Sequence, residues 1–178
     1  MRRFTEGFYG YAVAVFVSLG LVGVFFLVSP PSREEHIPKR EYGITVANFN
    51  RAVPYKVWAP SQDPAGWISN SNRVAKGEGG AQVLSIGYAT ATREHAMFLQ
   101  SDERPAAEFA NRLANSNQVV GSQDVAGTTW ERRFREDKKQ RTLVRMLPDV
   151  TLVVTGTASW EELGQLAAAL KELPKPAA

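Results

Sequence analysis

The N-terminal part of the chain carries one long apolar stretch. No charged side chain occurs between Gly7 and Ser32, and residues 8–28 read FYGYAVAVFVSLGLVGVFFLV. At a helical rise of about 1.5 Å per residue, residues 8–28 extend about 30 Å, which matches the hydrocarbon thickness of a bilayer. Because a helix satisfies its own backbone hydrogen bonds, the pattern predicts a transmembrane helix over 8–28.

A cleaved signal peptide is the alternative, since Arg2 and Arg3 precede the apolar run. The run is long for a signal peptide, no Ala-x-Ala site follows it, and Pro30 and Pro31 stand where a peptidase needs extended chain. We therefore predict that the segment is retained. Although basic residues also follow the run, the arginines directly before it favour a cytoplasmic N-terminus and an exported C-terminal part.

Small residues recur at every fourth position of this segment. Gly10, Ala14 and Ser18 would lie along one face of the helix, as in membrane helices that pack closely against each other. They are candidates for membrane-helix packing. The alternative is that small residues are simply common in such helices.

Three short amphipathic helices are predicted after the apolar run, over residues 45–53, 105–114 and 159–173. Thr45 is a candidate N-cap for the first helix. Ser159 and Glu162 have the spacing of a capping box, and Pro174 ends the third helix. The third helix carries a leucine-rich stripe that predicts packing on a sheet.

Strand patterns fill most of the remaining chain. The predicted extended segments are 55–59, 67–75, 81–90, 95–100, 118–126, 128–135, 141–147 and 150–157. Glycine-rich residues 76–80 suit a hairpin turn and lack the lysine and helix of a phosphate-binding loop. The last strand is the most apolar, so we expect it inside the sheet. The pattern predicts an α+β domain, with a mostly antiparallel sheet covered by two or three helices on one face.

The predicted domain organisation has five parts. They are a short cytoplasmic tail (1–7), the transmembrane helix (8–28), a juxtamembrane linker (29–41), an extracytoplasmic α+β domain (42–174) and a C-terminal tail (175–178).

Composition removes most catalytic and metal chemistry. Cysteine is absent, and the only histidines are His36 and His95, so disulfides, thiolate sites and most metal sites are excluded. We predict no cofactor, no metal and no enzyme activity. The enzyme alternative would depend on carboxylates such as Asp102, Glu103 or Asp124, which form no recognisable pair.

Positive charge is concentrated in one segment of the chain. Its charged residues are Arg132, Arg133, Arg135, Lys138, Lys139, Arg141 and Arg145, with Glu131, Glu136 and Asp137. The segment has a net charge of about +4 against +3 for the whole chain, so a nucleic-acid-binding surface is not predicted.

Four cations of this segment, Arg133, Arg135, Lys138 and Lys139, are candidate partner-binding residues. Strand alternation with Trp130 predicts that Arg133 and Arg135 point away from the core. Anionic lipid, a wall polymer or an acidic protein would suit them. The alternative is a solvated hairpin whose charges protect a sheet edge.

The chain contains four tryptophans, Trp58, Trp67, Trp130 and Trp160. Together they could form a platform for a carbohydrate or aromatic ligand. Each lies beside apolar residues at the start of a predicted strand or helix, so core packing is the favoured interpretation.

Several sequence segments resemble a known family. They are PYKVWAP at 54–60, GW at 66–67, TWE at 129–131, and VVTGTAS at 153–159 followed by Glu162-Leu163. The chain resembles a group of uncharacterised actinobacterial proteins that have one N-terminal membrane helix and one extracytoplasmic domain of unknown function. The resemblance covers nearly the whole chain, and its last segment is the most specific. It implies a cell-membrane protein with its domain outside, and it supplies no catalytic residues.

These patterns predict a membrane-anchored binding or assembly module that engages another component of the cell envelope. Its partners would be the lipid bilayer, through the N-terminal helix, and an envelope protein, anionic lipid or wall polymer. The alternatives are an envelope enzyme and a ligand sensor. A sensor is disfavoured because few residues would remain inside the cell to signal with.

Overall fold

The computed structural model describes residues 3–28 and 37–176, and within the N-terminal helix it describes the side chains of residues 10–25. The chain forms two compact units, residues 1–36 and 37–178. His36, most of the predicted linker, and the extreme ends of both predicted tails lie outside the described residues. The five predicted domain boundaries stay predictions.

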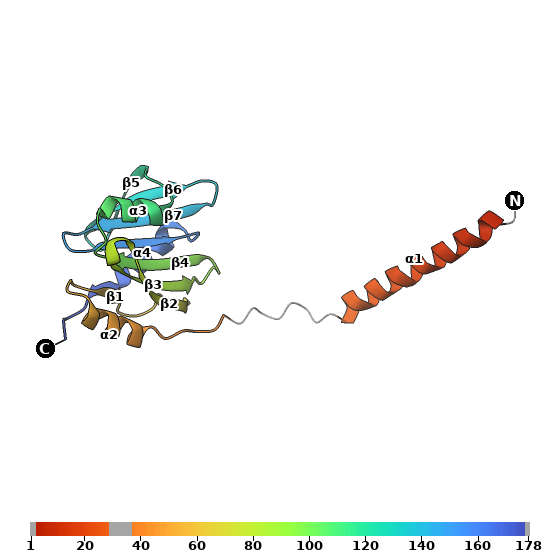
Figure 1. The fold of residues 1–178 in the computed structure, drawn as a ribbon, viewed down its shortest axis with the longest axis horizontal. Helices are drawn as coiled ribbons and strands as arrows, with labels where there is room; N and C mark the ends of the chain where they lie inside the picture. Colours follow the sequence, from red (N-terminus) through yellow and green to blue (C-terminus); the bar gives the residue numbers. More distant parts are fainter. Residues whose placement is uncertain (1–2, 29–36, 177–178) are drawn as a thin grey trace. The chain divides into compact units, whose positions relative to one another are not determined.

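The N-terminal unit contains helix α1, Arg3–Val28 (Figure 1). Its described apolar side chains are largely exposed, including Phe16 at 75% and Leu21 at 66%. In the part of the chain that the structure describes, no helix is both long enough and apolar enough to cross a membrane. The helix predicted over 8–28 is therefore confirmed as a helix, whereas its assignment as a transmembrane span is not.

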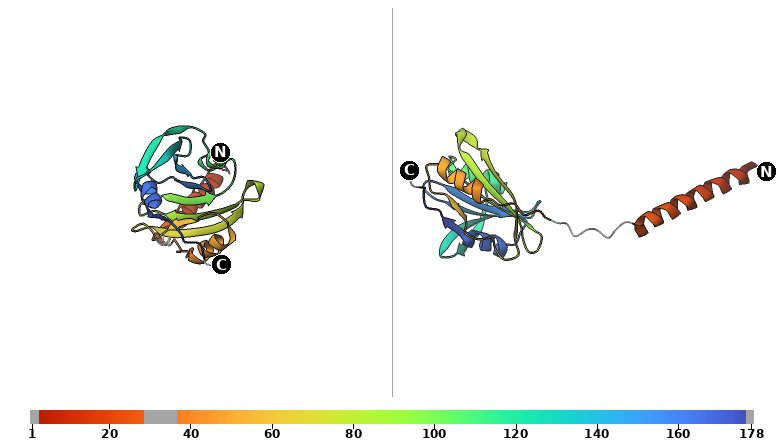
Figure 2. Two further views of the ribbon diagram at one scale, coloured as in Figure 1. Left: turned by 90° about the vertical axis from the view of Figure 1, so that its left-hand side faces the viewer. Right: turned by 90° about the horizontal axis from the view of Figure 1, so that it is seen from below.

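A twisted seven-stranded sheet forms the centre of the second unit (Figures 1 and 2). Its strands are β2 (Ile68–Lys76), β3 (Gln82–Ala89), β4 (His95–Ser101), β5 (Val119–Val125), β6 (Thr128–Arg135), β7 (Gln140–Met146) and β8 (Thr151–Gly156). The spatial order is β2-β3-β4-β8-β7-β6-β5, and every pairing is antiparallel. The predicted α+β class and antiparallel sheet are thus confirmed, and apolar β8 is an interior strand.

Three helices and a short ribbon complete this unit. They are α2 (Gly43–Ala52), α3 (Ala106–Ala114) and α4 (Trp160–Ala169), with the two-stranded ribbon of β1 (Trp58–Pro60) and β9 (Leu170–Glu172). A 3-10 turn, η1 (Glu78–Gly80), lies between β2 and β3, so the predicted glycine hairpin is confirmed. In Figure 1, α2 lies beside edge strand β2, while α3 lies over the β6–β7 side of the sheet.

The two faces of the sheet carry separate apolar cores. Every residue of β8 is buried, and successive residues of a strand point to opposite faces, so both faces of β8 are covered. Val154 pairs with Phe98 and belongs to the larger core, which contains α2 and α4. Val153 pairs with Leu99 on the opposite face and packs with Phe109 of α3. The prediction that helices cover one face is therefore wrong: a strand buried on both sides needs cover on both.

The third predicted helix is shorter than its leucine stripe indicated. Helix α4 ends at Ala169, and the next residues form β9, in which Leu170 pairs with Pro60. The amide of Leu173 donates to the carbonyl of Val57 at 2.8 Å. Here pairing with a strand that is distant in the sequence outweighs helix propensity, and the local periodicity carries no information about that pairing.

Thr45 is not the N-cap of α2, because the helix begins earlier, at Gly43. The Thr45 hydroxyl instead donates to Asn72 of β2 at 2.6 Å. The chain just before α2 is held to the same strand, since the Arg40 amide donates to the Ser69 carbonyl at 2.7 Å. These bonds fix α2 against the β2 edge.

Arg133 ties the β6 strand to α3. Its side chain is only 4% exposed, its guanidinium lies 3.1 Å from Glu131, and it donates a hydrogen bond to Asn111 of α3. The expectation that Arg133 points away from the core is therefore wrong. The side-chain alternation was assigned correctly, but the face opposite Trp130 is covered by a helix.

We predict that Arg133→Met lowers the free energy of unfolding by about 1–3 kcal/mol, because it leaves a half-buried acceptor on Asn111 without its donor. The measurement is urea unfolding at neutral pH. Lys138→Met is the matched control: Lys138 is exposed in the next turn, and the change should stay within about 0.5 kcal/mol. Equal midpoints for the two variants would contradict a structural role for Arg133.

The predicted capping box at the start of α4 is confirmed, and it gives Glu162 an unusual acidity. Burial raises the pKa of Glu162, but hydrogen bonds from the Thr92 hydroxyl and from the amide and hydroxyl of Ser159 outweigh burial and lower the pKa to about 2. The ionised form is thus favoured by folding.

We predict that Glu162→Gln lowers the free energy of unfolding by up to about 1 kcal/mol at pH 7. Because the folded pKa lies below the unfolded value of about 4.3, the wild-type advantage should be complete above that value and disappear as the pH falls towards 2. Urea midpoints measured from pH 7 to pH 2 test this. Glu161→Gln, at the exposed neighbouring position, serves as control and should show no such change. A difference that is independent of pH would refute the assignment.

Candidate functional site

The four predicted partner-binding cations do not form one exposed surface. Arg133 is buried, and Arg135 forms a two-point hydrogen bond with Asp137 at 2.7 and 2.8 Å. That bond lowers the pKa of Asp137. Of the four, Lys138 and Lys139 alone are exposed, and they lie in the β6–β7 turn. Partner binding by the four residues stays a prediction, but only the two lysines are freely presented.

Other arginines of the same hairpin also bind within the fold. Arg132 lies over the Trp160 ring, with the guanidinium carbon 3.9 Å from the ring centroid. Arg141 donates to the carbonyl of Thr157 at 3.1 Å. Most of the predicted basic segment is therefore structural.

Arg145 differs from these arginines. Its guanidinium lies over the Trp58 ring at 5.3 Å, and within the described residues it makes no hydrogen bond and no ion pair. Arg145 pairs with Leu152, which is fully buried, so its side chain emerges on the face of the larger core. The five guanidinium donors of this half-buried cation are thus open to solvent or to a ligand.

A cavity of about 310 Å³, which we name the Trp58–Arg145 pocket, lies beside this guanidinium. Its lining includes Trp58, Trp130, Arg145, Leu170, Lys171 and Glu172, from the β1–β9 ribbon and the β6 and β7 strands. Small apolar side chains from the end of α4 complete the wall. The pocket therefore combines an apolar wall with two cations.

Gln100 of β4 holds Trp58 in place. Its amide nitrogen donates to the Trp58 carbonyl at 2.6 Å, and its amide oxygen accepts from the Trp58 amide at 3.0 Å. Gln100 is itself fully buried. The indole nitrogen of Trp58 is also buried and has no hydrogen-bond partner among the described residues.

The pocket has a net positive lining. Lys171 is exposed at its edge, and Glu172, the acidic residue of the lining, forms an ion pair with Lys56 at 2.8 Å. That ion pair partly neutralises Glu172, so the charges of Arg145 and Lys171 are not balanced by the lining itself. Such a lining favours a negatively charged ligand.

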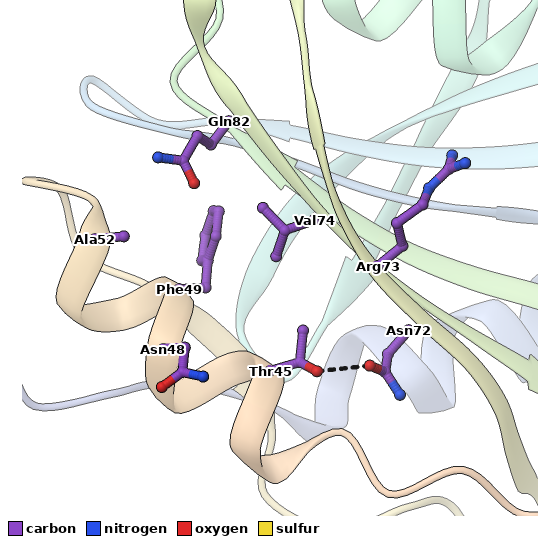
Figure 3. Close-up of a pocket in the computed structure, with 8 residues that line it drawn as sticks. All are labelled: Thr45, Asn48, Phe49, Ala52, Asn72, Arg73, Val74 and Gln82. Atoms are coloured by element: carbon purple, nitrogen blue, oxygen red, sulfur yellow. Dashed lines mark hydrogen bonds between the residues drawn. The ribbon is translucent and has the colours of Figure 1, made fainter.

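A second cavity, of about 400 Å³, lies between α2 and the β2 edge (Figure 3). Phe49 and Val74 face each other across it, and the Thr45–Asn72 hydrogen bond lies at one end. Arg73 points away from α2 in this view. This cavity offers apolar and amide groups but no charged group directed into it.

A third cavity, of about 470 Å³, is lined by Tyr55, Asp102, Arg104 and Asp149 among others. Burial raises the pKa of Tyr55, so its hydroxyl stays protonated at neutral pH and no phenolate is present to act as a general base. The Arg104 guanidinium donates to the carbonyl of Pro148.

The carboxylates of the enzyme alternative do not converge. Glu103 is 2% exposed and bound to Arg112 at 2.7 Å, whereas Asp124 accepts from the Thr129 hydroxyl at 2.6 Å. Asp102 follows β4 and Asp124 lies on β5, and three strands separate these two in the sheet, about 19 Å at the usual strand spacing. Among the described residues, no cluster of three or more histidine, aspartate or glutamate side chains is arranged to hold a metal ion.

The small residues Gly10, Ala14 and Ser18 all lie on α1 and are exposed. Ala14 and Ser18 line a shallow depression on the helix together with Tyr11. Their part in helix packing stays a prediction.

Sequence reasoning considered the tryptophans and the basic segment separately and did not connect Trp58 with Arg145. One signal was available. Arg145 lies two residues after Leu143 and therefore on the same strand face, which the pattern places towards the core, so a charged side chain at the border of the core could have been recognised. The pairing of β1 with β9 was not readable from the local pattern.

Comparisons with known proteins give a family but no activity. No curated protein matches the chain. Two solved structures are similar: "Crystal structure of MucB in complex with MucA(peri)" and "The complex structure of Pseudomonas aeruginosa MucA/MucB". Both have a TM-score of 0.40, at 10% and 11% identity over 65% of this chain, which covers 36% and 34% of those chains. The chain thus spans about a third of their length, and likeness of this degree says nothing about function.

The family model described as "Protein of unknown function (DUF4245)" matches residues 3–170. The resemblance predicted from the sequence is thereby confirmed as membership of an uncharacterised family over nearly the whole chain, while its actinobacterial and membrane aspects stay predictions. On this match the chain belongs to the DUF4245 family of proteins of unknown function.

Proposed function

We propose that this protein is a binding module attached to a membrane by α1, with its folded unit outside the cytoplasm and in contact with another component of the cell envelope. The single observation that carries the proposal is the apolar surface of α1. Over residues 10–25 its valines, leucines and aromatic side chains are exposed to a degree that water disfavours.

Lipid would cover this surface. The described side chains, those of residues 10–25, cover only part of the thickness of a bilayer. The uncharged sequence extends over residues 8–28, and we propose that lipid covers this whole stretch. Arg2 and Arg3 directly before this stretch favour a cytoplasmic N-terminus. Both features are consistent with a single helix whose C-terminal side faces the exterior.

The folded unit is suited to binding because it is self-contained. It has its own two cores and a buried central strand, and its carboxylates are separated or engaged in ion pairs and hydrogen bonds. Its cavities are lined by fixed side chains on sheet and helices, which is the usual arrangement of a recognition surface. We therefore propose binding without catalysis.

We predict that α1 anchors the chain with the folded unit outside. Because the chain lacks cysteine, one introduced thiol is a unique label. In intact cells a membrane-impermeant maleimide should label Ser122→Cys, an exposed position on β5, and should label Thr5→Cys only after permeabilisation.

Alkaline carbonate extraction provides the matching test of anchoring. The wild-type chain should stay in the membrane pellet, and Val17→Lys with Leu21→Lys should release it, because each lysine near a bilayer centre costs about 3 kcal/mol. Ser122→Lys should have no effect. The proposal fails if mature protein begins at or beyond residue 29 by N-terminal sequencing, or if Thr5→Cys is labelled in intact cells.

We also predict a specific neighbour in the envelope. A photoreactive side chain placed at exposed positions of the folded unit, for instance Lys138 or Lys171, should give the same crosslinked product in repeated experiments. The double-lysine variant of α1, which should leave the membrane, should lose that product. Products that differ between repeats, or that survive release from the membrane, would argue against an envelope partner.

A further inference from the structure

The Trp58–Arg145 pocket contains donors that the protein leaves without acceptors. In the same hairpin, Arg133 and Arg135 each bind a carboxylate and Arg141 binds a carbonyl. Arg145 binds neither, although its side chain is half-buried. Since a guanidinium that is partly removed from water is stabilised by an acceptor, a ligand that supplies one would be favoured here.

Charge and shape define the class of ligand. Lys171 adds a second cation, and the acidic Glu172 is already paired with Lys56. Most of the other lining residues carry aliphatic or indole side chains, including Trp130 at 2% exposure and Leu170 at 5%, and Thr128 adds a hydroxyl. The cavity, at about 310 Å³, is at the small end of ligand pockets.

The pocket is not occupied by the described part of the chain's own C-terminus. The carbonyl of Pro174 accepts from the Asn50 side chain, and the Lys175 ammonium donates to the carbonyls of Asn50 and Val53. These bonds direct residues 174–175 to the end of α2. The pocket lining is thus complete without a segment from elsewhere in the described chain.

We propose that the Trp58–Arg145 pocket binds a small organic anion, in which a carboxylate or phosphate group lies against Arg145 and an attached apolar body lies against Trp58 and Trp130. Arg145 provides a two-donor fork for the oxyanion, and Lys171 provides the long-range attraction. The buried Gln100 amide keeps Trp58, and therefore the wall, in position. The inference concerns the folded unit and does not depend on membrane attachment.

The test uses the full-length chain in a neutral detergent and reads the indole N–H NMR signals, with the Trp58 signal assigned through Trp58→Phe. The probes are benzoate, phenyl phosphate, neutral benzamide and inorganic phosphate. We expect benzoate or phenyl phosphate to shift the Trp58 signal saturably. Binding of one alone identifies the oxyanion, and binding of both shows that charge with an apolar body suffices.

Two variants separate ligand binding from stability. Arg145→Gln should weaken binding of the effective anion by about tenfold or more while lowering the urea midpoint less than Arg141→Gln does, because Arg145 contacts the Trp58 ring but makes no hydrogen bond or ion pair within the described fold. Arg141→Gln, four residues earlier on the same strand face, is the matched control. The Arg141→Gln variant should lower the urea midpoint without weakening binding of the anion.

Four results would overturn the proposal. The first three are no shift of the Trp58 signal with either anion, binding of benzamide as tight as that of the anions, and wild-type anion binding by Arg145→Gln. The fourth is inorganic phosphate binding as tightly as phenyl phosphate, which would remove the role of the apolar wall.

Discussion

Burial of β8 on both faces is the constraint on which the rest of the folded unit depends. A strand in which every residue is buried needs one apolar layer above the sheet and another below it. Helices α2 and α4 with the β1–β9 ribbon supply one layer, and α3 supplies the other. Because α3 covers the second face, the polar residues of β6 and β7 on that face are enclosed and must be paired. Arg133 with Glu131 and Asn111, and Thr142 with Thr155, are the result.

The same constraint explains why a cationic hairpin is mostly structural. Long arginine stems add apolar contact at the border of a core while the guanidinium reaches an aromatic face or an acceptor. Arg132 over Trp160 and Arg141 at the Thr157 carbonyl follow this pattern. Arg145 has the aromatic face without the acceptor. Within the described residues its side chain therefore packs on an aromatic ring but has no acceptor for its charge, and the proposal of an anion site rests on this difference.

Local pattern predicted the elements well and their long-range assembly poorly. Alternation located the strands, the Ser159–Glu162 spacing located the start of α4, and the apolar content of residues 150–157 identified the central strand. The same patterns cannot report a second layer of helix, because Arg133 has the same local sequence whether α3 or water covers it. Nor can they report that Leu170 leaves a helix to pair with Pro60, since the partner lies more than a hundred residues earlier. The Trp58–Arg145 pocket was not predicted because part of its wall is formed by the pairing of β1 with β9.

The location of the pocket has a thermodynamic consequence. Its wall joins β1, near the start of the folded unit, to β9, near its end, and Gln100 links β1 to the middle of the sheet. Closing these contacts requires the whole unit to be folded, so an unfolded chain offers no comparable site. A ligand that binds only the closed arrangement stabilises it by an amount that grows with ligand concentration relative to its dissociation constant. Occupancy would therefore hold the two ends of the unit together, and loosening of the β1–β9 ribbon is the motion that ligand binding would oppose most directly.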